Sequence, residues 1–319
     1  MLTTHSIFEQ MNKLGADKVP FFFMIDFLKE HGEVIPLADL LDDIQFSMHA
    51  EKQEISHKDF LFAKHPISYE DYQKQFKVVH DNLMFGNSYL TNLTCATPIK
   101  TNLSIEEIYK LTQAKYKLNY KNQFVCFSPE IFVQIKNGKI SSYPMKGTID
   151  ASIPYAKEII LNDEKEAAEH ATIVDLIRND LSLVSNNVTV TNYRFIDELI
   201  TNDKTLLQVS SEIVGDLEDD FISQIGTIFD KLLPAGSICG APKKKTVEII
   251  LEAENYNRNF YTGVFGVFDG ENVDSAVMIR FIEQENNQLI FKSGGGITAK
   301  SECESEFNEM IQKVYVPIY

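Results

Sequence analysis

The chain has 319 residues and a formal net charge of −16, from 30 basic and 46 acidic side chains. This negative surplus argues against non-specific binding to nucleic acids or to anionic membranes, because both need a basic surface. An acidic protein that handles an anionic substrate must therefore gather its positive groups, or a metal ion, at one place. The length allows one or two domains, and since no repeat or linker divides it, we expect a single domain.

The predicted elements mix helices with hairpins. The apolar segment 21–25 is predicted to be a buried strand, because it is too short to cross a membrane. Asn137-Gly138 and Asp269-Gly270 are typical of hairpin turns. Strands are expected at 124–144, 262–282 and 288–293, and helices at 105–118, 155–185, 218–232, 242–254 and 301–314. Hairpins interleaved with long helices, without a βαβ rhythm, predict an α+β fold with antiparallel sheets.

The cysteines indicate a reducing environment. Cys95, Cys126, Cys239 and Cys303 are scattered and form no CxxC pair, so we expect reduced thiols. No N-terminal signal sequence is visible, and a cytoplasmic location is the expectation.

A lysine stands in a constrained turn at Tyr143-Pro144-Met145-Lys146-Gly147-Thr148. Proline restricts the entry to this turn and glycine frees its exit, so the ammonium group is held at a defined point. Such a lysine becomes a nucleophile when desolvation or a nearby cation lowers its pKa; otherwise it is a solvated turn residue. Glu130 begins a neighbouring strand region, and the hairpin between them can bring Glu130 near Lys146 as an acid/base partner.

Carboxylates on the last predicted helix suggest a metal site. Glu302, Glu306 and Glu309 have the helical spacing i, i+4, i+7. Like charges on one stripe repel each other unless a cation neutralises them, and Mg²⁺ prefers such oxygen ligands. A solvated acidic face would produce the same pattern.

The helix predicted at 155–185 carries a second candidate group. Glu169 and His170 lie beside its wide apolar stripe, where ionisable side chains are costly unless they are paired, hydrogen-bonded or metal-bound. A satisfied, partly buried histidine is the alternative for His170. We interpret Arg178-Asn179-Asp180 as a structural ion-pair cluster at the end of the helix.

Three further features suit an anionic ligand. Gly294-Gly295-Gly296 lets the backbone approach a ligand, and a helix start just beyond it adds partial positive charge; a flexible turn is the alternative. Arg280 lies inside the apolar segment 276–282, where a charge usually has a specific anionic partner. Tyr261 begins the preceding strand region and could present its phenol to a ligand.

Taken together, these segments resemble the chorismate-utilising enzymes, which comprise the aminodeoxychorismate, anthranilate, isochorismate and salicylate synthases. The matching segments follow the family order: SPE (128–130), PMKGT (144–148), EHATIVDLIRNDL (169–181), LLPAGSICGAPK (232–243), YTGVFG (261–266), IRF (279–281) and GGGITAKSECESEFNE (294–309). The resemblance implies antiparallel β-sheets packed as a sandwich with helices outside, as in anthranilate synthase component I. It also implies one catalytic domain over 1–319, with a shortened N-terminal part (1–80) and a motif-bearing core (80–319). Because the N-terminal part is short, we expect neither a full regulatory subdomain nor feedback by tryptophan.

Lys146 points to a subclass. A lysine in the PxKGT turn resembles aminodeoxychorismate synthase, whereas the other synthases usually carry a small residue there. The resemblance thus implies component I of that enzyme, which converts chorismate and ammonia to 4-amino-4-deoxychorismate for 4-aminobenzoate and folate biosynthesis. The alternatives are anthranilate synthase component I and a non-catalytic, Mg²⁺-dependent binding subunit. Ammonia is expected from a separate glutamine amidotransferase subunit, since the chain shows no glutaminase domain.

The resemblance also implies residue roles. Lys146 attacks C2 of chorismate, and Glu130 protonates the departing C4 hydroxyl. Mg²⁺ is bound by Glu169, Glu306 and Glu309. The expected substrate-binding residues are Thr148, His170, Tyr261, Arg280, Gly295 and Gly296.

Two positions depart from the family pattern. Leu90 occupies the place of a lysine base in isochorismate-type enzymes and of a glutamine in the aminating ones, which argues against water as the nucleophile. Cys239 replaces the usual threonine of the GSxTGAPK segment, which puts its hydrogen bond in doubt.

Overall fold

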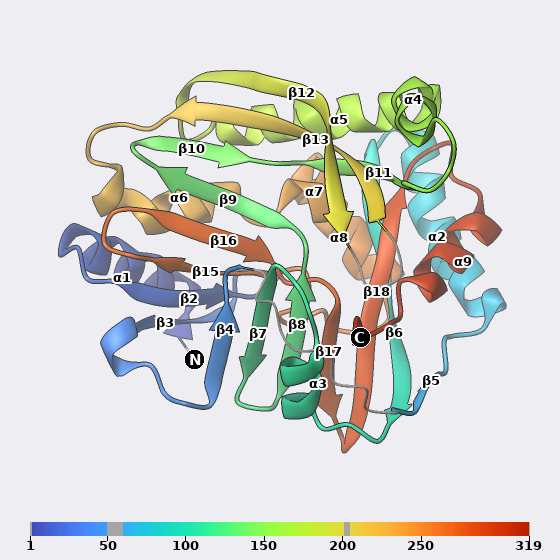
Figure 1. Cartoon of the computed structure of the whole chain (residues 1–319), viewed down its shortest axis with the longest axis horizontal. Helices are drawn as coiled ribbons and strands as arrows, with labels where there is room; N and C mark the ends of the chain where they lie inside the picture. The colour runs from blue at the N-terminus through green and yellow to red at the C-terminus, as the bar shows by residue number, and fades with distance from the viewer. Residues whose placement is uncertain (1, 50–59, 201–204, 319) are drawn as a thin grey trace.

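The computed structural model describes residues 2–49, 60–200 and 205–318. Within these ranges the chain forms two antiparallel sheets, of ten and eight strands, whose strands run crosswise to each other (Figure 1). The larger sheet has the order β1 (Leu2–Thr3), β3 (His31–Pro36), β2 (Phe21–Ile25), β15 (Val264–Phe268), β16 (Val273–Val277), β9 (Ile131–Lys136), β10 (Lys139–Ser142), β13 (Thr205–Asp216) and β11 (Met145–Asp150), and β12 (Asn186–Ile200) also pairs with β13. The smaller sheet has the order β14 (Gly240–Ala241), β6 (Leu90–Thr101), β18 (Gln288–Ile297), β17 (Phe281–Glu285), β8 (Phe124–Ser128), β7 (Tyr116–Tyr120) and β4 (Ile44–Ser47), and β5 (Phe62–Lys64) also pairs with β6.

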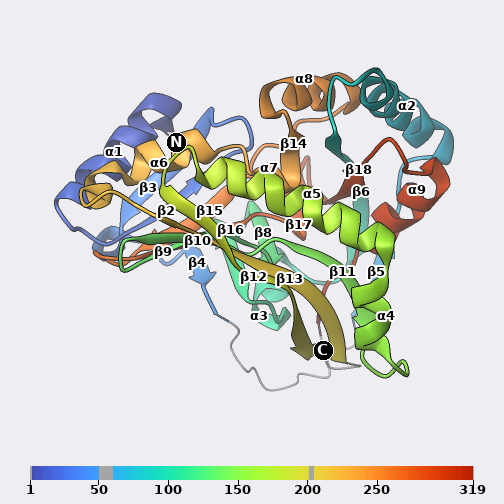
Figure 2. The same ribbon diagram turned by 90° about the horizontal axis from the view of Figure 1, so that it is seen from above.

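Helices cover the outer faces of both sheets. They are α1 (Thr4–Ala16), α2 (Tyr69–Phe85), α3 (Ile105–Leu111), α4 (Ala156–Asn162), α5 (Glu164–Leu181), α6 (Ile225–Leu232), α7 (Gly236–Cys239), α8 (Lys243–Ala253) and α9 (Cys303–Gln312). Figure 2 shows α1, α6 and α5 along one side of the larger sheet, while α2, α8 and α9 gather at the smaller one. Apolar side chains of these helices fill the outer cores.

The inner faces of the two sheets meet in an aromatic core. Phe22 and Phe265 of the larger sheet pack in one cluster with Tyr120, Phe124 and Phe281 of the smaller sheet. The burial of these rings drives the sheets together, since apolar area removed from water is the main favourable term in folding. The predicted α+β sandwich of antiparallel sheets with helices outside is confirmed.

The strand region predicted over 262–282 forms the hairpin β15–β16 expected around Asp269-Gly270, and its last part then joins the two sheets. Val277 pairs with Val264 in the larger sheet, whereas Phe281 pairs with Cys126 and Lys292 in the smaller one. The chain crosses between sheets at 278–280, and Arg280 adopts a left-handed conformation with φ 51°. The prediction of Arg280 inside a strand was therefore wrong, and this side chain lies at the seam between the sheets.

Several element boundaries also differ from the predictions. The helix expected at 105–118 stops at Leu111, and β7 begins at Tyr116 because both of its faces are buried. The region 155–185 is two helices, since Asp163 breaks it and caps α5 by accepting a hydrogen bond from Glu166 N at 2.9 Å. The long hairpin β12–β13 was not predicted. The helix expected at 218–232 is α-helical from Ile225, after a 3₁₀ turn at Phe221–Gln224.

The described helices include none that is long and apolar enough to cross a membrane.

The four thiols should differ sharply in reactivity. Cys95, Cys126 and Cys239 are buried, and burial raises the pKa of Cys95 to about 12 and that of Cys239 to about 11. Because the thiolate is the reactive form, we expect a disulfide reagent such as DTNB to label Cys303 in the native protein and the other three after unfolding. A Cys303→Ser variant should lose the native phase. Labelling of two or more thiols in the native state would contradict this burial.

Candidate active site

A cavity of about 740 Å³ lies between α5, the start of β6 and the segment that precedes α9. Its volume falls within the usual range for small-molecule sites. The lining residues are Tyr89, Leu90, Lys146, Glu164, Lys165, Ala168, Glu169, Thr172, Ile173, Thr298, Ala299 and Lys300. The wall therefore includes Lys146 and Glu169 from distant parts of the sequence.

Lys146 is placed by a β-bulge. It lies in the edge strand β11 (not in a turn, as predicted), and the register with β13 shifts between Met145 and Thr148. Gly147 has φ 82°, which favours glycine, and a side chain there would also meet Glu166 Oε2 at 3.1 Å. The bulge thus lets α5 approach β11 closely.

An ion pair holds the Lys146 amine. Its Nζ lies 2.8 Å from Glu169 Oε2. Burial lowers the pKa of Lys146, but the hydrogen bond to Glu169 and the charges of Glu166 and Glu309 raise the pKa by more. In this arrangement the amine is held as an ammonium group, so nucleophilic attack requires another cation to take over these carboxylates.

Two carboxylates of α9 converge on the glycine segment. A methyl group at Gly295 would lie 3.4 Å from Glu309 Oε1 and 3.5 Å from Glu306 Oε2. Burial and the charge of Glu309 raise the pKa of Glu306. Glu302, one turn earlier, is exposed at the N-terminus of the helix. The predicted stripe therefore divides into Glu302, at the start of the helix, and two members near Gly295, of which Glu306 is half-buried and Glu309 is exposed.

The sequence analysis missed Lys313. Its Nζ lies 2.7 Å from Glu309 Oε1 and donates a hydrogen bond to Gly294 O at 2.9 Å. Burial raises the pKa of Glu309, but the charge and hydrogen bond of Lys313 together with the charges of Lys146 and Lys165 lower it by more. The i, i+4 spacing of Glu309 and Lys313 was the available signal.

Glu130 lies between β8 and β9 and is not among the residues that line the cavity. Its Oε1 accepts a hydrogen bond from Ser237 Oγ at 2.7 Å. Burial raises the pKa of Glu130, although Ser237, Arg280 and Lys313 each oppose this shift. Among the described residues no hydrogen bond or ion pair joins Glu130 to Lys146. The expected direct pair is thus not formed.

Arg280 and Tyr261 flank the seam between the sheets. The Arg280 guanidinium stacks over the Tyr315 ring at 5.2 Å from its centroid, and no carboxylate in the described ranges forms an ion pair with it. Tyr261 is buried, and burial raises the pKa of its phenol, which therefore stays protonated. Both can hydrogen-bond an anion.

The glycines are part of β18, not of a turn. Gly294, Gly295 and Gly296 pair with Thr94, Leu93 and Asn92 of β6. The helix α9 begins at Cys303, so its N-terminus does not directly follow them as predicted.

Of the predicted catalytic, metal-binding and substrate-binding residues, only Lys146 and Glu169 line the cavity described above. Thr148 and His170 are among those that do not. Thr148 is exposed and pairs with Gln208. His170 is buried, and its Nε2 lies 2.7 Å from Ser211 Oγ. Burial, Arg194 and Lys146 lower the pKa of His170 to about 4, so the imidazole is neutral at physiological pH.

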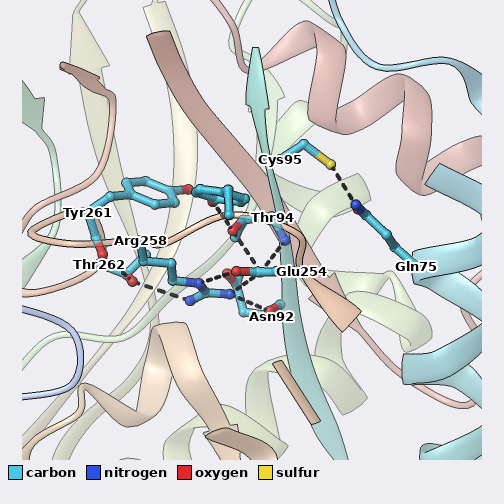
Figure 3. A network of polar contacts seen from close by, with 9 residues as sticks. Gln75, Asn92, Thr94, Cys95, Glu254, Arg258, Tyr261 and Thr262 are labelled. Atoms are coloured by element: carbon cyan, nitrogen blue, oxygen red, sulfur yellow. Dashed lines mark hydrogen bonds and ion pairs between the residues drawn. The ribbon is translucent and has the colours of Figure 1, made fainter. Parts of the chain in front are cut away.

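A buried ion pair between Arg258 and Glu254 is bonded to β6, the strand that pairs with the glycines of β18 (Figure 3). Arg258 donates to both carboxylate oxygens of Glu254 and to Asn92 O at 2.8 Å. Glu254 Oε1 in turn accepts from Thr94 N and from Thr94 Oγ1, each at 2.8 Å. Arg258 Nη1 also donates to Thr262 Oγ1 at 3.2 Å, beside Tyr261. The network ties β6 to the loop that carries Tyr261.

Comparison with known proteins identifies the family. The model for chorismate binding enzymes matches residues 29–318. The chain belongs to the chorismate-binding enzyme family. It is 50% identical over 323 residues to an uncharacterised PabA-like protein of Pasteurella multocida, with 99% of this chain and 100% of that protein covered.

More distant relatives have named activities. This chorismate-binding protein is 30% identical over 269 residues to aminodeoxychorismate synthase component 1 of Bacillus subtilis, covering 78% of this chain and 55% of that protein. Its structure matches anthranilate synthase component I from Streptococcus pneumoniae with a TM-score of 0.67 and 25% identity, covering 82% of this chain and 60% of that one. Both subclasses that the sequence suggested are thus among its relatives.

The carboxylates of Glu169, Glu306 and Glu309 are oxygen ligands of the kind that magnesium binds. Mg²⁺ takes oxygen ligands from one or two carboxylates and completes its shell with water and substrate. Glu169 and Glu309 are each neutralised by a lysine here, Lys146 and Lys313. As the side chains stand, no three His, Cys, Asp or Glu residues of the described ranges group closely enough to hold a metal ion.

Proposed function

We propose that this enzyme is component I of an aminodeoxychorismate synthase, which converts chorismate and ammonia to 4-amino-4-deoxychorismate. The observation that carries the proposal is Lys146, a primary amine on the wall of the cavity beside Glu169. An amine is a nucleophile once it is uncharged, and its place on a strand fixes its position. Leu90 lines the same cavity and cannot act as a base toward water.

The proposed first step is a substitution in which both conjugated double bonds of the ring shift. The uncharged Lys146 amine bonds to C2 of chorismate, and the C4–O bond breaks. Glu130 gives its proton to the departing oxygen, which leaves as water. The Lys146 nitrogen, now bonded to C2, loses a proton. Burial raises the pKa of Glu130, which keeps the acid form available.

The second step reverses the shift. Ammonia bonds to C4, both double bonds return to their first positions, and the bond between C2 and Lys146 breaks. A proton from the added nitrogen passes to the departing amine. The product carries nitrogen where chorismate carried the C4 oxygen. Lys146 ends as it began.

Charge complementarity supports chorismate as the substrate. The carboxylates of chorismate would be held by Arg280 and Tyr261 at the seam and by the backbone of Gly295 and Gly296. Thr148 and His170, which do not line the cavity, would help to orient the substrate. Magnesium would be held by Glu169, Glu306 and Glu309, and when bound it supplies positive charge for the ring carboxylate and frees Lys146 from its ion pair. These groups concentrate positive charge in a chain of net charge −16.

The nitrogen source is proposed to be a separate glutamine amidotransferase subunit. The PabA-like name of the Pasteurella relative agrees with such a partnership. Free ammonium should replace the partner in an assay.

One assay tests the proposal. Purified protein with chorismate, Mg²⁺ and ammonium should form 4-amino-4-deoxychorismate, which an added aminodeoxychorismate lyase converts to 4-aminobenzoate. Chromatography identifies the product, and omission of Mg²⁺ or ammonium should remove it. Anthranilate or isochorismate as the main product would overturn the proposed activity.

A further inference from the structure

The segment Leu232–Lys243 carries a hydroxyl group that no role so far explains. Ser237, in the short helix α7, donates its hydroxyl proton to Glu130 Oε1 at 2.7 Å. Glu130 is proposed above as the general acid. We propose that Ser237 is a positioning residue that orients Glu130 and selects the oxygen that carries its proton, an inference that rests on the proposed function.

The backbone of Glu130 is itself held in place. Glu130 N donates to Ser128 Oγ at 3.1 Å, and Glu130 O accepts from Val277 N at 3.2 Å. With the backbone anchored to β16, the remaining freedom of this residue is in its side-chain torsions. One hydrogen bond to Oε1 is then sufficient to restrict the carboxyl group.

The segment that carries Ser237 is anchored as well. Lys243 forms an ion pair with Asp180 at 2.8 Å and donates to Leu232 O, so it joins both ends of the segment to α5. Gly236 permits this approach, because a methyl group there would lie 2.5 Å from Asp180 Oδ2. Asp180 was interpreted from the sequence as structural. Its pairing connects the α5 motif to the position of Ser237.

The hydrogen bond assigns the proton to one oxygen. A carboxylic acid accepts through its carbonyl oxygen and donates through its hydroxyl oxygen. Because Oε1 accepts from Ser237, the acid proton resides on Oε2. When Oε2 gives this proton to the leaving C4 oxygen, the resulting carboxylate keeps the Ser237 hydrogen bond, which is stronger to a charged acceptor. Ser237 therefore stabilises the state that follows proton transfer more than the state before it.

The charged groups that face Glu130 make the effect measurable. They are Arg280, from the crossing between the sheets, and Lys313, after α9. Both cations and the Ser237 hydroxyl favour the charged carboxylate, against burial. Loss of the hydroxyl should thus raise the pKa of the acid while Arg280 and Lys313 remain.

The test is the pH profile of Ser237→Ala, with chorismate consumption as the readout. We expect kcat to fall about tenfold with KM for chorismate nearly unchanged. The alkaline limb of the pH profile should shift to higher pH by roughly one pH unit. Ser237→Thr, which keeps the hydroxyl, should restore both. Ser223→Ala, on an exposed serine bonded to Asp220 O, is the matched control and should match the wild type.

Each outcome is decisive. An unshifted limb in Ser237→Ala, or a Ser237→Thr variant no better than alanine, would overturn the positioning role. If alanine prevents folding, Ser237→Cys, with its weak S–H donor, should show the same upward limb. Wild-type protein that makes anthranilate would refute the proposed activity but leave this test intact, because that reaction also expels the C4 oxygen.

Discussion

Lys146→Ala should lower kcat for chorismate consumption on the order of a thousandfold or more, because it removes the proposed nucleophile. The same variant also leaves Glu169 without its partner at 2.8 Å. A second variant must therefore distinguish loss of the positive charge from loss of the nucleophile. Lys146→Arg keeps a cation beside Glu169 but cannot form the bond, and it should be as inactive as alanine. Steady-state assays by chromatography of the product measure both.

A lysine elsewhere in the larger sheet is the control for Lys146. Lys139 on β10 pairs with Asp216 at 2.5 Å on the surface, and Lys139→Ala should retain wild-type activity. Mass spectrometry after incubation without ammonia should also detect an adduct of chorismate minus water on Lys146. Full activity in Lys146→Ala would remove this lysine from the mechanism, while activity in Lys146→Arg alone would assign it an electrostatic role.

Arg258→Met should reduce the free energy of unfolding by about 3–5 kcal/mol, because it leaves the buried Glu254 carboxylate without its partner. Arg258 is 4% exposed, and its guanidinium lies 4.6 Å from the centroid of Phe27. Methionine retains part of this packing but none of the five donors. Urea denaturation followed by circular dichroism measures the loss.

A second substitution distinguishes the cost of an unpaired Glu254 carboxylate from the cost of lost side-chain packing. Arg258→Met with Glu254→Gln should recover part of the stability, since removing both charges costs less than removing one. Lys77→Met, which breaks the surface pair with Asp81, is the control and should leave the urea midpoint unchanged. An Arg258→Met protein with a wild-type midpoint would show that the network does not support the strand β6.

Local sequence patterns predicted the parts of this protein that depend on near neighbours. The Asn137-Gly138 hairpin forms between β9 and β10, with Lys136 paired to Lys139. The helix expected at 242–254 appears as α8, Lys243–Ala253. Such elements follow from turn residues and periodicity over one segment, which the sequence displays directly.

The elements that were wrong depend on distant partners. Tyr116 and Leu118 fall within the helix expected at 105–118, yet they are part of β7, which pairs with β4 and β8. Arg280 lies inside an apolar segment, yet the chain crosses between the sheets at 278–280. In both cases contacts with other strands outweigh local propensity, which is weak in short apolar segments.

The sequence by itself determined the chemical groups of the site and the family order in which they occur. Only the tertiary structure decided which of them meet: Lys146 with Glu169, and Glu130 with Ser237. The physical reason is that a charged or acidic side chain in a buried site takes the partner that the packed sheets and helices bring within hydrogen-bond distance. Residues separated by 107 positions, as Glu130 and Ser237 are, have no local pattern that records this contact.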